Sequence, residues 1–382
     1  MATKKIITHD FILSFLSQFA ISFSFQLLLP TLPIYLSRLG SGEEEIGVLI
    51  GVSSVSSLFL RPFVGKALLR IPEKHFMSVG AVLIALTSVG YLLLLPFWPF
   101  FLVRVLHGVG MGFYYTASFT LIANISPEDH LGQSLGYFYL SFNFASTLAP
   151  PFGMFLIDNY GFTVLFLTCA GFSIGSFLFA SRLGRRQADP LEDSSFQAKS
   201  LFSREALPSS IITFFCHIIW GALITFFPLY ALDHGVSNPG LFFAVFAIML
   251  VLGRSLGGRI LDISSREKVI LPCLTVYLIA MIILTFSKTL PMFILSAVIW
   301  GMGNAFLFPT LVAYALDDAG PSRGPAMATF TAAADLGAGM GSVIMGLVLR
   351  FTNYRTMFLC LVLVGVINLY YFILSVRKRR VI

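Results

Sequence analysis

The chain has 382 residues, of which 57% are hydrophobic and only 11% are charged, and its formal net charge is +7. A chain this apolar cannot enclose its apolar surface in one aqueous core, which excludes an ordinary soluble globular protein. Apolar runs of about 20 residues, the length that crosses a bilayer, recur along the whole sequence. The composition therefore predicts an all-α, polytopic membrane protein.

The apolar runs predict twelve membrane-spanning helices in chain order. The first, residues 11–36, is too long for the hydrophobic region of a signal peptide and is followed by no small-residue cleavage site, so we expect it to be a span. The expected helices lie at roughly 11–36, 46–66, 76–95, 98–124, 133–157, 161–181, 209–232, 239–260, 268–287, 290–316, 325–349 and 355–375.

The basic residues are distributed unevenly between the two sides of the membrane. Twelve spans place both termini on one side, and that side then carries 18 lysines and arginines, including the tail at residues 377–380. The opposite side keeps only Arg38, Lys288, Arg350 and Arg355. This asymmetry predicts that both termini lie in the cytoplasm, and we expect the membrane to be the bacterial cytoplasmic (inner) membrane. The positive charge is thus explained by topology, and we expect no nucleic-acid partner.

A polar linker and an internal repeat divide the chain. The one long polar segment between spans is 182–208, which separates a six-helix bundle at 1–181 from a second at 209–382. Pro33 and Tyr35 before Gly40 recur 195 positions later, and Gly108 with Gly110 recur 193 positions later as Gly301 with Gly303. Such a parallel repeat predicts two related bundles and a binding site near the middle of the membrane.

Arg61-Pro62-x-x-Gly65 with Arg70 and Arg254-x-x-x-Gly258-x-x-x-Asp262 are related motifs near the end of the second helix of each half. They resemble motifs of the major facilitator superfamily, in particular of its bacterial efflux branch of drug:proton antiporters and arabinose-efflux-like exporters. Arg61, Gly65 and Arg70 resemble the loop signature of the first half. Arg254, Gly258 and Asp262 resemble its second-half copy, whereas Leu69 stands where the first-half signature has its acidic residue. The resemblance implies that these six residues act in gating, with Asp262 as the surviving acid.

Motifs in the fourth, fifth and eleventh predicted helices extend the resemblance over essentially the whole chain. Arg104 with His107 and Gly108 resembles the helix-four motif with its membrane-embedded arginine. The run Ala145-x-x-x-Ala149-Pro150-x-x-Gly153 is a degenerate form of the helix-five antiporter motif, and Asp335-Leu336-Gly337 resembles helix eleven of the arabinose-efflux-like group. The resemblance implies a twelve-helix secondary transporter that exports a small molecule in exchange for protons.

Few ionisable residues lie deep in the predicted spans, where a charge is costly and needs a partner or water. Asp335 is expected near the middle of its helix, and it is either a proton carrier or a structural carboxylate bonded to neighbouring helices. Arg104 is always charged, so it can hold an anionic substrate or bias a nearby carboxylate, or it can simply anchor its helix. His217 is a second candidate for proton coupling because an imidazole titrates near neutral pH.

Polar stripes on the first and seventh predicted helices are the main candidates for contact with a substrate. Gln18, Ser22 and Gln26 recur at four-residue steps and therefore share a helix face, and adding 195 gives Thr213, His217 and Gly221. The alternative is that these stripes hold helices together by hydrogen bonds. Other residues on helices that line the family's cavity complete the predicted site: His107, Tyr114, Tyr115, Asn143, Trp220, Trp300 and Asn304.

Enzymatic functions find little support in the motifs. The sequence has no GxxxxGK[ST] phosphate loop and no HExxH, and its cysteines and histidines have no metal-ligand spacing, so we expect no enzyme activity, no cofactor and no metal. The predicted partners are a small-molecule substrate, protons and membrane lipid, and we expect a monomer. Two alternatives on the same fold remain open, namely a lipid or lysolipid flippase and a proton-coupled importer.

Overall fold

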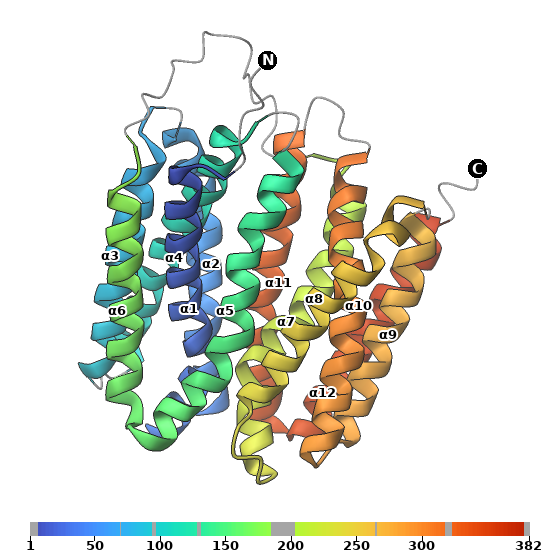
Figure 1. Cartoon of the computed structure of the whole chain (residues 1–382). Helices are drawn as coiled ribbons and strands as arrows, with labels where there is room; N and C mark the ends of the chain where they lie inside the picture. Colours follow the sequence, from blue (N-terminus) through green and yellow to red (C-terminus); the bar gives the residue numbers. More distant parts are fainter. Residues whose placement is uncertain are drawn as a thin grey trace. The chain divides into compact units, whose positions relative to one another are not determined.

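The structure is a computed structural model that describes residues 7–68, 70–93, 97–127, 131–184, 203–263, 266–317 and 323–377. Within these ranges it contains twelve long α-helices and no β-strand (Figure 1). The helices are α1 His9–Arg38, α2 Glu43–Ala67, α3 Glu73–Gly90, α4 Phe97–Ile125, α5 Leu131–Asn159, α6 Gly161–Ser181, α7 Leu207–Asp233, α8 Gly240–Ile263, α9 Arg266–Phe286, α10 Leu290–Asp317, α11 Arg323–Phe351 and α12 Tyr354–Tyr371. A short 3-10 helix, η1 Tyr91–Leu93, extends α3.

The predicted all-α fold of twelve helices is confirmed, and every predicted helix overlaps an observed one along most of its length. Ten of the twelve are long and apolar enough to cross a membrane by length and composition. Apolar side chains also lie exposed along the helices, such as Phe59, Leu102 and Leu167, of which Phe59 is 71% exposed. In water such surfaces would be strongly unfavourable, but on helices of bilayer length they are the surface that contacts lipid.

The chain divides into two compact units, whose boundaries differ from those of the predicted halves near the first loop. The first unit contains Met1–Leu32 and Val52–Phe196, and the second contains Pro33–Gly51 and Gln197–Ile382. The segment Pro33–Gly51 joins the second unit because the start of α2 packs closely on α11. A β-carbon at Gly51 would lie 2.6 Å from the carbonyl oxygen of Gly339, so only glycine allows this approach. Of the predicted linker 182–208, residues 185–202 lie outside the described residues.

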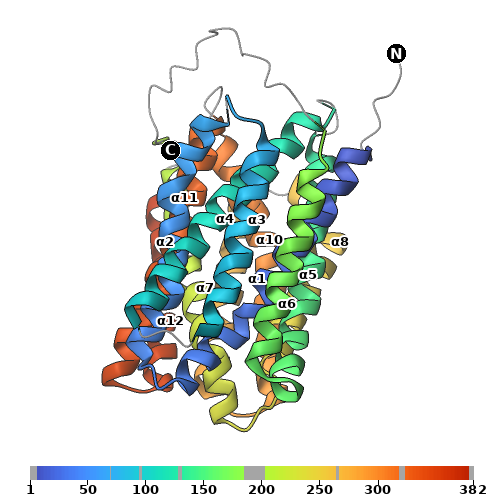
Figure 2. The same cartoon turned by 90° about the vertical axis from the view of Figure 1, so that its left-hand side faces the viewer.

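Both units use the same helix packing, so the internal repeat of the sequence corresponds to a repeat in the structure. In the first unit α3 packs between α4 and α6, and in the second unit α9 packs between α10 and α12 (Figures 1 and 2). A β-carbon at Gly108 would overlap Ser53 and Ser56, and one at Gly301 would meet Phe246 and Met249. Since 246 and 249 are 53 and 56 plus 193, the two contacts are the same contact in the two units.

The turns after α1 and α7 are also repeat-related. Gly40 and Gly235 both have positive φ, 88° and 75°, which is the left-handed region that favours glycine. Both are followed by the same helix-terminating hydrogen bonds, from Ser41 to the Leu36 carbonyl and from Val236 to the Ala231 carbonyl. The glycine repeat seen in the sequence therefore marks both turns and helix contacts.

The described residues that precede α7 are fixed by a short polar turn. The Ser203 hydroxyl donates to the Glu205 carboxylate over 2.7 Å, and the Ser203 amide donates to Thr329 of α11 over 3.0 Å. The hydrogen bond from Ser203 holds the pKa of Glu205 below its usual value, because it favours the ionised carboxylate.

Candidate functional site in the two helical units

Among the described residues of the first unit, the most enclosed charged side chain is that of Arg104 of α4, which is only 4% exposed. Its guanidinium donates to the Ser53 hydroxyl of α2 over 2.6 Å and to the Tyr91 hydroxyl of η1 over 3.2 Å. A β-carbon at Gly108, one turn further along α4, would overlap Ser53, so the two helices approach closely at this level. Arg104 therefore ties three elements together inside the unit.

His107 lies beside this arginine but bonds to a different helix. Its Nδ1 is 3.1 Å from the Thr87 hydroxyl of α3, and Thr87 gives its only hydroxyl proton to the Ile84 carbonyl. A neutral ring that donates from Nδ1 to Thr87 keeps Nε2 as an acceptor, and the other tautomer reverses these two roles. Among the described residues, no hydrogen-bond partner reaches Nε2, which is fully buried. The structure thus places this predicted cavity residue between α3 and α4.

The second unit replaces this polar cluster by apolar residues at the repeat-equivalent positions. Adding 193 to the numbers of the cluster residues Ser53, Thr87, Tyr91, Arg104 and His107 gives Phe246, Ala280, Leu284, Ala297 and Trp300. All five replacements are buried. The two units therefore share their backbone packing but differ in chemistry at the same place.

The polar stripe of α1 contacts two helices of its own unit. The Gln18 amide donates to Ser22 over 3.2 Å, and the Ser22 hydroxyl is 3.5 Å from the Tyr115 hydroxyl of α4. Gln26 donates to Ser146 of α5. Gln18, Ser22 and Gln26 are all at least 97% buried. The predicted shared face is real, and its contacts run to α4 and α5.

Tyr114 of α4 contacts α1 at a residue outside the polar stripe. Its hydroxyl is 2.6 Å from the Ser17 hydroxyl, which in turn donates to the Ser176 carbonyl of α6 over 3.0 Å. Tyr114 is completely buried, whereas its neighbour Tyr115 is half-buried. Of the two predicted tyrosines, Tyr115 is thus the one that reaches the stripe of Gln18 and Ser22.

In the second unit, α7 and α11 approach so closely that glycines replace side chains. A β-carbon at Gly341 would overlap the Ile218 carbonyl, and one at Gly221 would overlap the Ala338 carbonyl. His217, half-buried, bonds through Nδ1 to the Thr213 carbonyl of its own helix over 2.9 Å, and Gly337 packs on its β-carbon. The buried Thr213 hydroxyl has no hydrogen-bond partner among the described residues.

Asp335 lies on α11, one turn before Gly339 and on the face of α11 that Gly51 contacts. It is half-buried, about 18 Å along the helix from Arg323 at 1.5 Å per residue. Gln26 of α1 and Gly221 of α7 are repeat-equivalent positions; Gln26 contacts Ser146 of α5, and Gly221 contacts Ala338 of α11. These two contacts relate α5 to α11 by an offset of 192 positions. By that relation Asn143 of α5 is the counterpart of Asp335, and it is buried.

In the second unit the predicted residues Trp220 and Trp300 form an aromatic cluster with Phe242, Phe246 and Tyr277. The ring centroids of Trp220 and Trp300 are 5.5 Å apart, and Phe246 lies 4.3 Å from Trp300. Trp300 is fully buried and Trp220 half-buried. Asn304 donates to the Tyr277 hydroxyl over 2.8 Å, and the Tyr277 ring packs against Trp300. Within the unit, Trp220 is the member of this cluster with an accessible surface.

The six predicted gating residues do not share one environment. Gly65 and Arg70 are exposed near the end of α2, while Arg61 and Arg254 are half-buried within α2 and α8. Arg61 is close enough to Tyr115 for its charge to act on the tyrosine hydroxyl. The backbones of Gly258 and Asp262 belong to α8, but their surroundings lie outside the described part of the chain.

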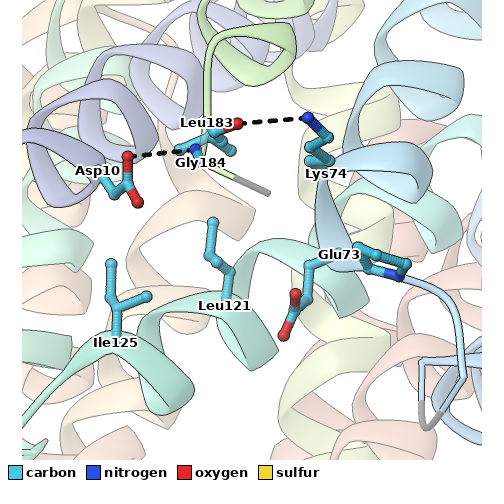
Figure 3. A pocket seen from close by; sticks show the side chains of 8 residues that line it. Asp10, Glu73, Lys74, Leu121, Ile125, Leu183 and Gly184 are labelled. Carbon is cyan, nitrogen blue, oxygen red and sulfur yellow. Dashed lines mark hydrogen bonds between the residues drawn. The ribbon is translucent and has the colours of Figure 1, made fainter. Parts of the chain in front are cut away.

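A polar pocket lies where α1 and α3 begin and α4 and α6 end. Figure 3 shows the Asp10 carboxylate accepting from the Gly184 amide over 3.4 Å and Lys74 donating to the Leu183 carbonyl over 3.4 Å. The apolar side chains of Leu121 and Ile125 line the same pocket (Figure 3). The two hydrogen bonds join the starts of α1 and α3 to the end of α6, and none of the predicted site residues lies here.

Several polar partners were not predicted from the sequence, namely Ser17, Ser53, Thr87, Tyr91, Ser146 and Ser176. Ser, Thr and Tyr are common in these helices, so their presence alone carries little information. A signal did exist for three of them, because Ser53, Thr87 and Tyr91 become Phe246, Ala280 and Leu284 in the second half. Among the described residues, no group of three or more His, Cys, Asp and Glu could hold a metal ion.

Comparison with known proteins agrees with this arrangement. A family model described as Major Facilitator Superfamily matches residues 14–262 and 209–381. The staphylopine export protein of Staphylococcus aureus is 26% identical over 362 residues, which cover 90% of this chain and 90% of that protein. The multidrug resistance protein MdtG of Klebsiella pneumoniae is 26% identical over 376 residues, or 93% of this chain and 90% of that protein.

Solved structures share the fold at lower sequence identity. The nucleoside transporter NupG superposes with a TM-score of 0.80 at 15% identity, covering 96% of this chain and 99% of that chain. A bacterial homologue of the human lysosomal transporter Spinster superposes with a TM-score of 0.78 at 14% identity. Together with the family match, the two six-helix repeats and the membrane-length helices, these comparisons show that the chain belongs to the Major Facilitator Superfamily and is related to its bacterial efflux transporters.

Proposed function

We propose that this chain exports a small organic molecule across the bacterial cytoplasmic membrane in exchange for protons. Family membership makes it a transporter, and two relatives of nearly full coverage bear names that describe export or drug resistance. In this proposal the protein works as a monomer with both termini in the cytoplasm, by alternating access, in which one binding site opens to each side of the membrane in turn. No enzymatic step and no cofactor take part.

The observation that carries the proton coupling is the position of Asp335. Every other carboxylate within a described helix lies in its first or last two turns, whereas Asp335 lies about 18 Å into α11. A carboxylate in the hydrocarbon region is costly, so such residues usually mark an ion or substrate pathway. A carboxyl group can take up a proton in one state and release it in another, which its counterpart Asn143 cannot do.

Two further residues support the same cycle. His217 packs against α11 next to Gly337 and is the one histidine within α7. Arg104 keeps its charge at every pH that a cell meets, so it supplies a fixed positive field in the first unit. In the proposal Asp335 carries the proton, His217 is a secondary proton site, and Arg104 supplies a constant charge.

The test replaces Asp335 by Asn in the full-length protein reconstituted into liposomes that contain a pH-sensitive dye. The matched control is Asp158→Asn, because Asp158 is exposed near the end of α5. Citrate and ethidium serve as probes of opposite charge. We expect Asp335→Asn to lower probe-driven proton flux by about tenfold or more, while exchange of labelled probe across the liposome membrane continues. The control should keep both activities.

Two outcomes would contradict the proposal. Undiminished proton flux in Asp335→Asn removes the proton-carrier role from this residue. Probe transport by the unmodified protein without any proton movement removes proton coupling altogether. Movement of phospholipid between leaflets in place of either probe would instead support a flippase.

A further inference from the structure

The interior of the first unit is positively charged. Within the helical residues of this unit the acidic ones are Asp10, Glu73 and Asp158, and each lies within the first two or last two residues of its helix. Away from the helix ends the unit carries two arginines, Arg61 of α2 and Arg104 of α4, and no carboxylate of its own. A positive interior in a low-dielectric setting attracts anions.

The two arginines differ in how they are held. Arg104 is almost completely buried and bonds to Ser53 and Tyr91, so its guanidinium is committed to packing. Arg61 is half-buried, which leaves part of its side chain accessible. It lies six residues before the last residue of α2, about 9 Å into the helix. Of the two arginines, Arg61 is therefore the more exposed.

The helix packing brings Arg61 to the polar stripe of α1. A β-carbon at Gly112 of α4 would lie 3.2 Å from the Ser57 carbonyl and 3.5 Å from the Leu60 side chain, so α2 and α4 are close at this level. One turn along, Arg61 lies close enough to Tyr115 for an electrostatic interaction with its hydroxyl. That hydroxyl is 3.5 Å from Ser22, which accepts from the Gln18 amide over 3.2 Å.

The side-chain amide of Gln18 has one polar atom without a hydrogen-bond partner among the described residues. The residue is 1% exposed, its amide nitrogen bonds to Ser22, and its amide oxygen has no hydrogen-bond partner among the described residues. If the amide is turned so that its oxygen and nitrogen exchange places, one of the two atoms still has no hydrogen-bond partner. A buried polar atom without a partner is costly, and a bound polar group would remove that cost.

We propose that Gln18, Ser22, Tyr115 and Arg61 form an anion subsite, and that the exported molecule is an organic carboxylate with further polar groups rather than a lipophilic cation. Arg61 matches a carboxylate in charge and in planar geometry. The Tyr115 hydroxyl and the spare atom of the Gln18 amide take neighbouring polar groups of the same molecule. This inference rests on the transport function proposed above and names its substrate class.

The test measures ligand-induced thermal stabilisation of the purified full-length protein at matched ionic strength. The probes are citrate and iminodisuccinate, compared with trimethyl citrate, which has lost its charges, and with tetraphenylphosphonium, a lipophilic cation. A ligand that binds the folded state raises the melting temperature, and the shift grows with the logarithm of the ligand concentration divided by its dissociation constant when the ligand is in excess. We expect stabilisation by at least one of the two carboxylates, little by the ester, and none by the cation.

Variants identify the residue responsible. We expect Arg61→Gln to weaken carboxylate binding about tenfold or more, and Arg61→Lys, which keeps the charge, to weaken it less. Tyr115→Phe, which removes one hydroxyl, should weaken binding while keeping the fold if Arg61→Gln proves unstable. The control is Arg182→Gln, since Arg182 is exposed at the end of α6.

Several results would overturn the inference: no response to either carboxylate, an equal response to the ester, a response to tetraphenylphosphonium alone, or full carboxylate affinity in both Arg61→Gln and Tyr115→Phe. Failure here is distinguishable from failure of proton-coupled export. Proton-coupled transport of a cation would leave the proposed function standing and reject the anion subsite.

Discussion

Arg104 connects α2, α4 and η1, because its hydrogen bonds to Ser53 and Tyr91 reach two different elements. A guanidinium can serve both because its donors spread in a plane, whereas a lysine ammonium is a compact point charge on a flexible stem. The neighbouring His107 bonds to α3, so a four-element contact depends on two adjacent side chains. Arg104 is thus an anchor of the first unit as well as a source of positive field.

This anchoring leads to a stability prediction for Arg104→Lys. We expect it to lower stability by about 1–2 kcal/mol, because one of the charge-assisted hydrogen bonds to Ser53 and Tyr91 is lost. The measurement is the apparent melting temperature in detergent at a fixed heating rate. Arg182→Lys is the control, since Arg182 is exposed and should tolerate the change. Equal melting temperatures for the two variants would show that Arg104 does not anchor the unit.

The identities of the polar residues were partly predictable from the sequence, but their partners were not. Four-residue spacing indicated that Gln18, Ser22 and Gln26 share a face, and the structure bears this out. Helical periodicity gives the direction of a side chain around its own axis, but it does not say which neighbouring helix lies there. The sequence therefore could not indicate that Tyr115 and Ser146 receive this stripe, or that Arg61 lies near Tyr115.

Helix packing in both units depends on glycines that allow backbones to touch. The contact of α7 with α11 uses Gly221, Gly337 and Gly341, and the contact of α2 with α11 uses Gly47 and Gly51. Close approach through small residues is a common basis of helix association in membranes, where the hydrophobic effect between helices is absent. Such contacts are sensitive to the addition of a single methyl group.

A matched pair of glycines tests this dependence. A β-carbon at Gly341 would overlap the Ile218 carbonyl and lie 2.8 Å from its Cα, and these backbone atoms cannot move cheaply. We expect Gly341→Ala to destabilise the protein by about 1–3 kcal/mol through overpacking. Gly175→Ala should be neutral or slightly stabilising, because nothing lies within 4 Å of a β-carbon at this helical position. The readout is again the apparent melting temperature, and a similar loss in both variants would contradict tight packing at Gly341.

The helices themselves were predictable to within a few residues because their signal is strong. Long apolar runs end at polar turns, and Gly40 and Gly235 supply the left-handed residues that terminate α1 and α7. The division into units was less predictable. The loop segment Pro33–Gly51 groups with the second unit because Gly47 and Gly51 contact α11, a long-range contact that no local pattern announces.

Across the whole chain, one backbone plan occurs twice with different chemistry. Equivalent glycines make equivalent contacts, yet the first unit places Ser53, Arg104 and His107 where the second places Phe246, Ala297 and Trp300. A symmetric scaffold is sufficient for helix packing, so the asymmetric interior fits the specialised roles proposed above. The first unit supplies positive charge and hydrogen bonds, and the second supplies Asp335 and an aromatic surface.

The most direct test of proton-coupled export uses everted membrane vesicles, whose outer surface is the cytoplasmic face. Acidifying the vesicle interior provides protons that an exporter exchanges for substrate. Our account predicts that labelled citrate accumulates inside vesicles that contain the protein, that Asp335→Asn abolishes the accumulation, and that collapse of the pH gradient by nigericin releases the label. Accumulation of citrate or ethidium that ignores the pH gradient, or that occurs only in right-side-out vesicles, would contradict it.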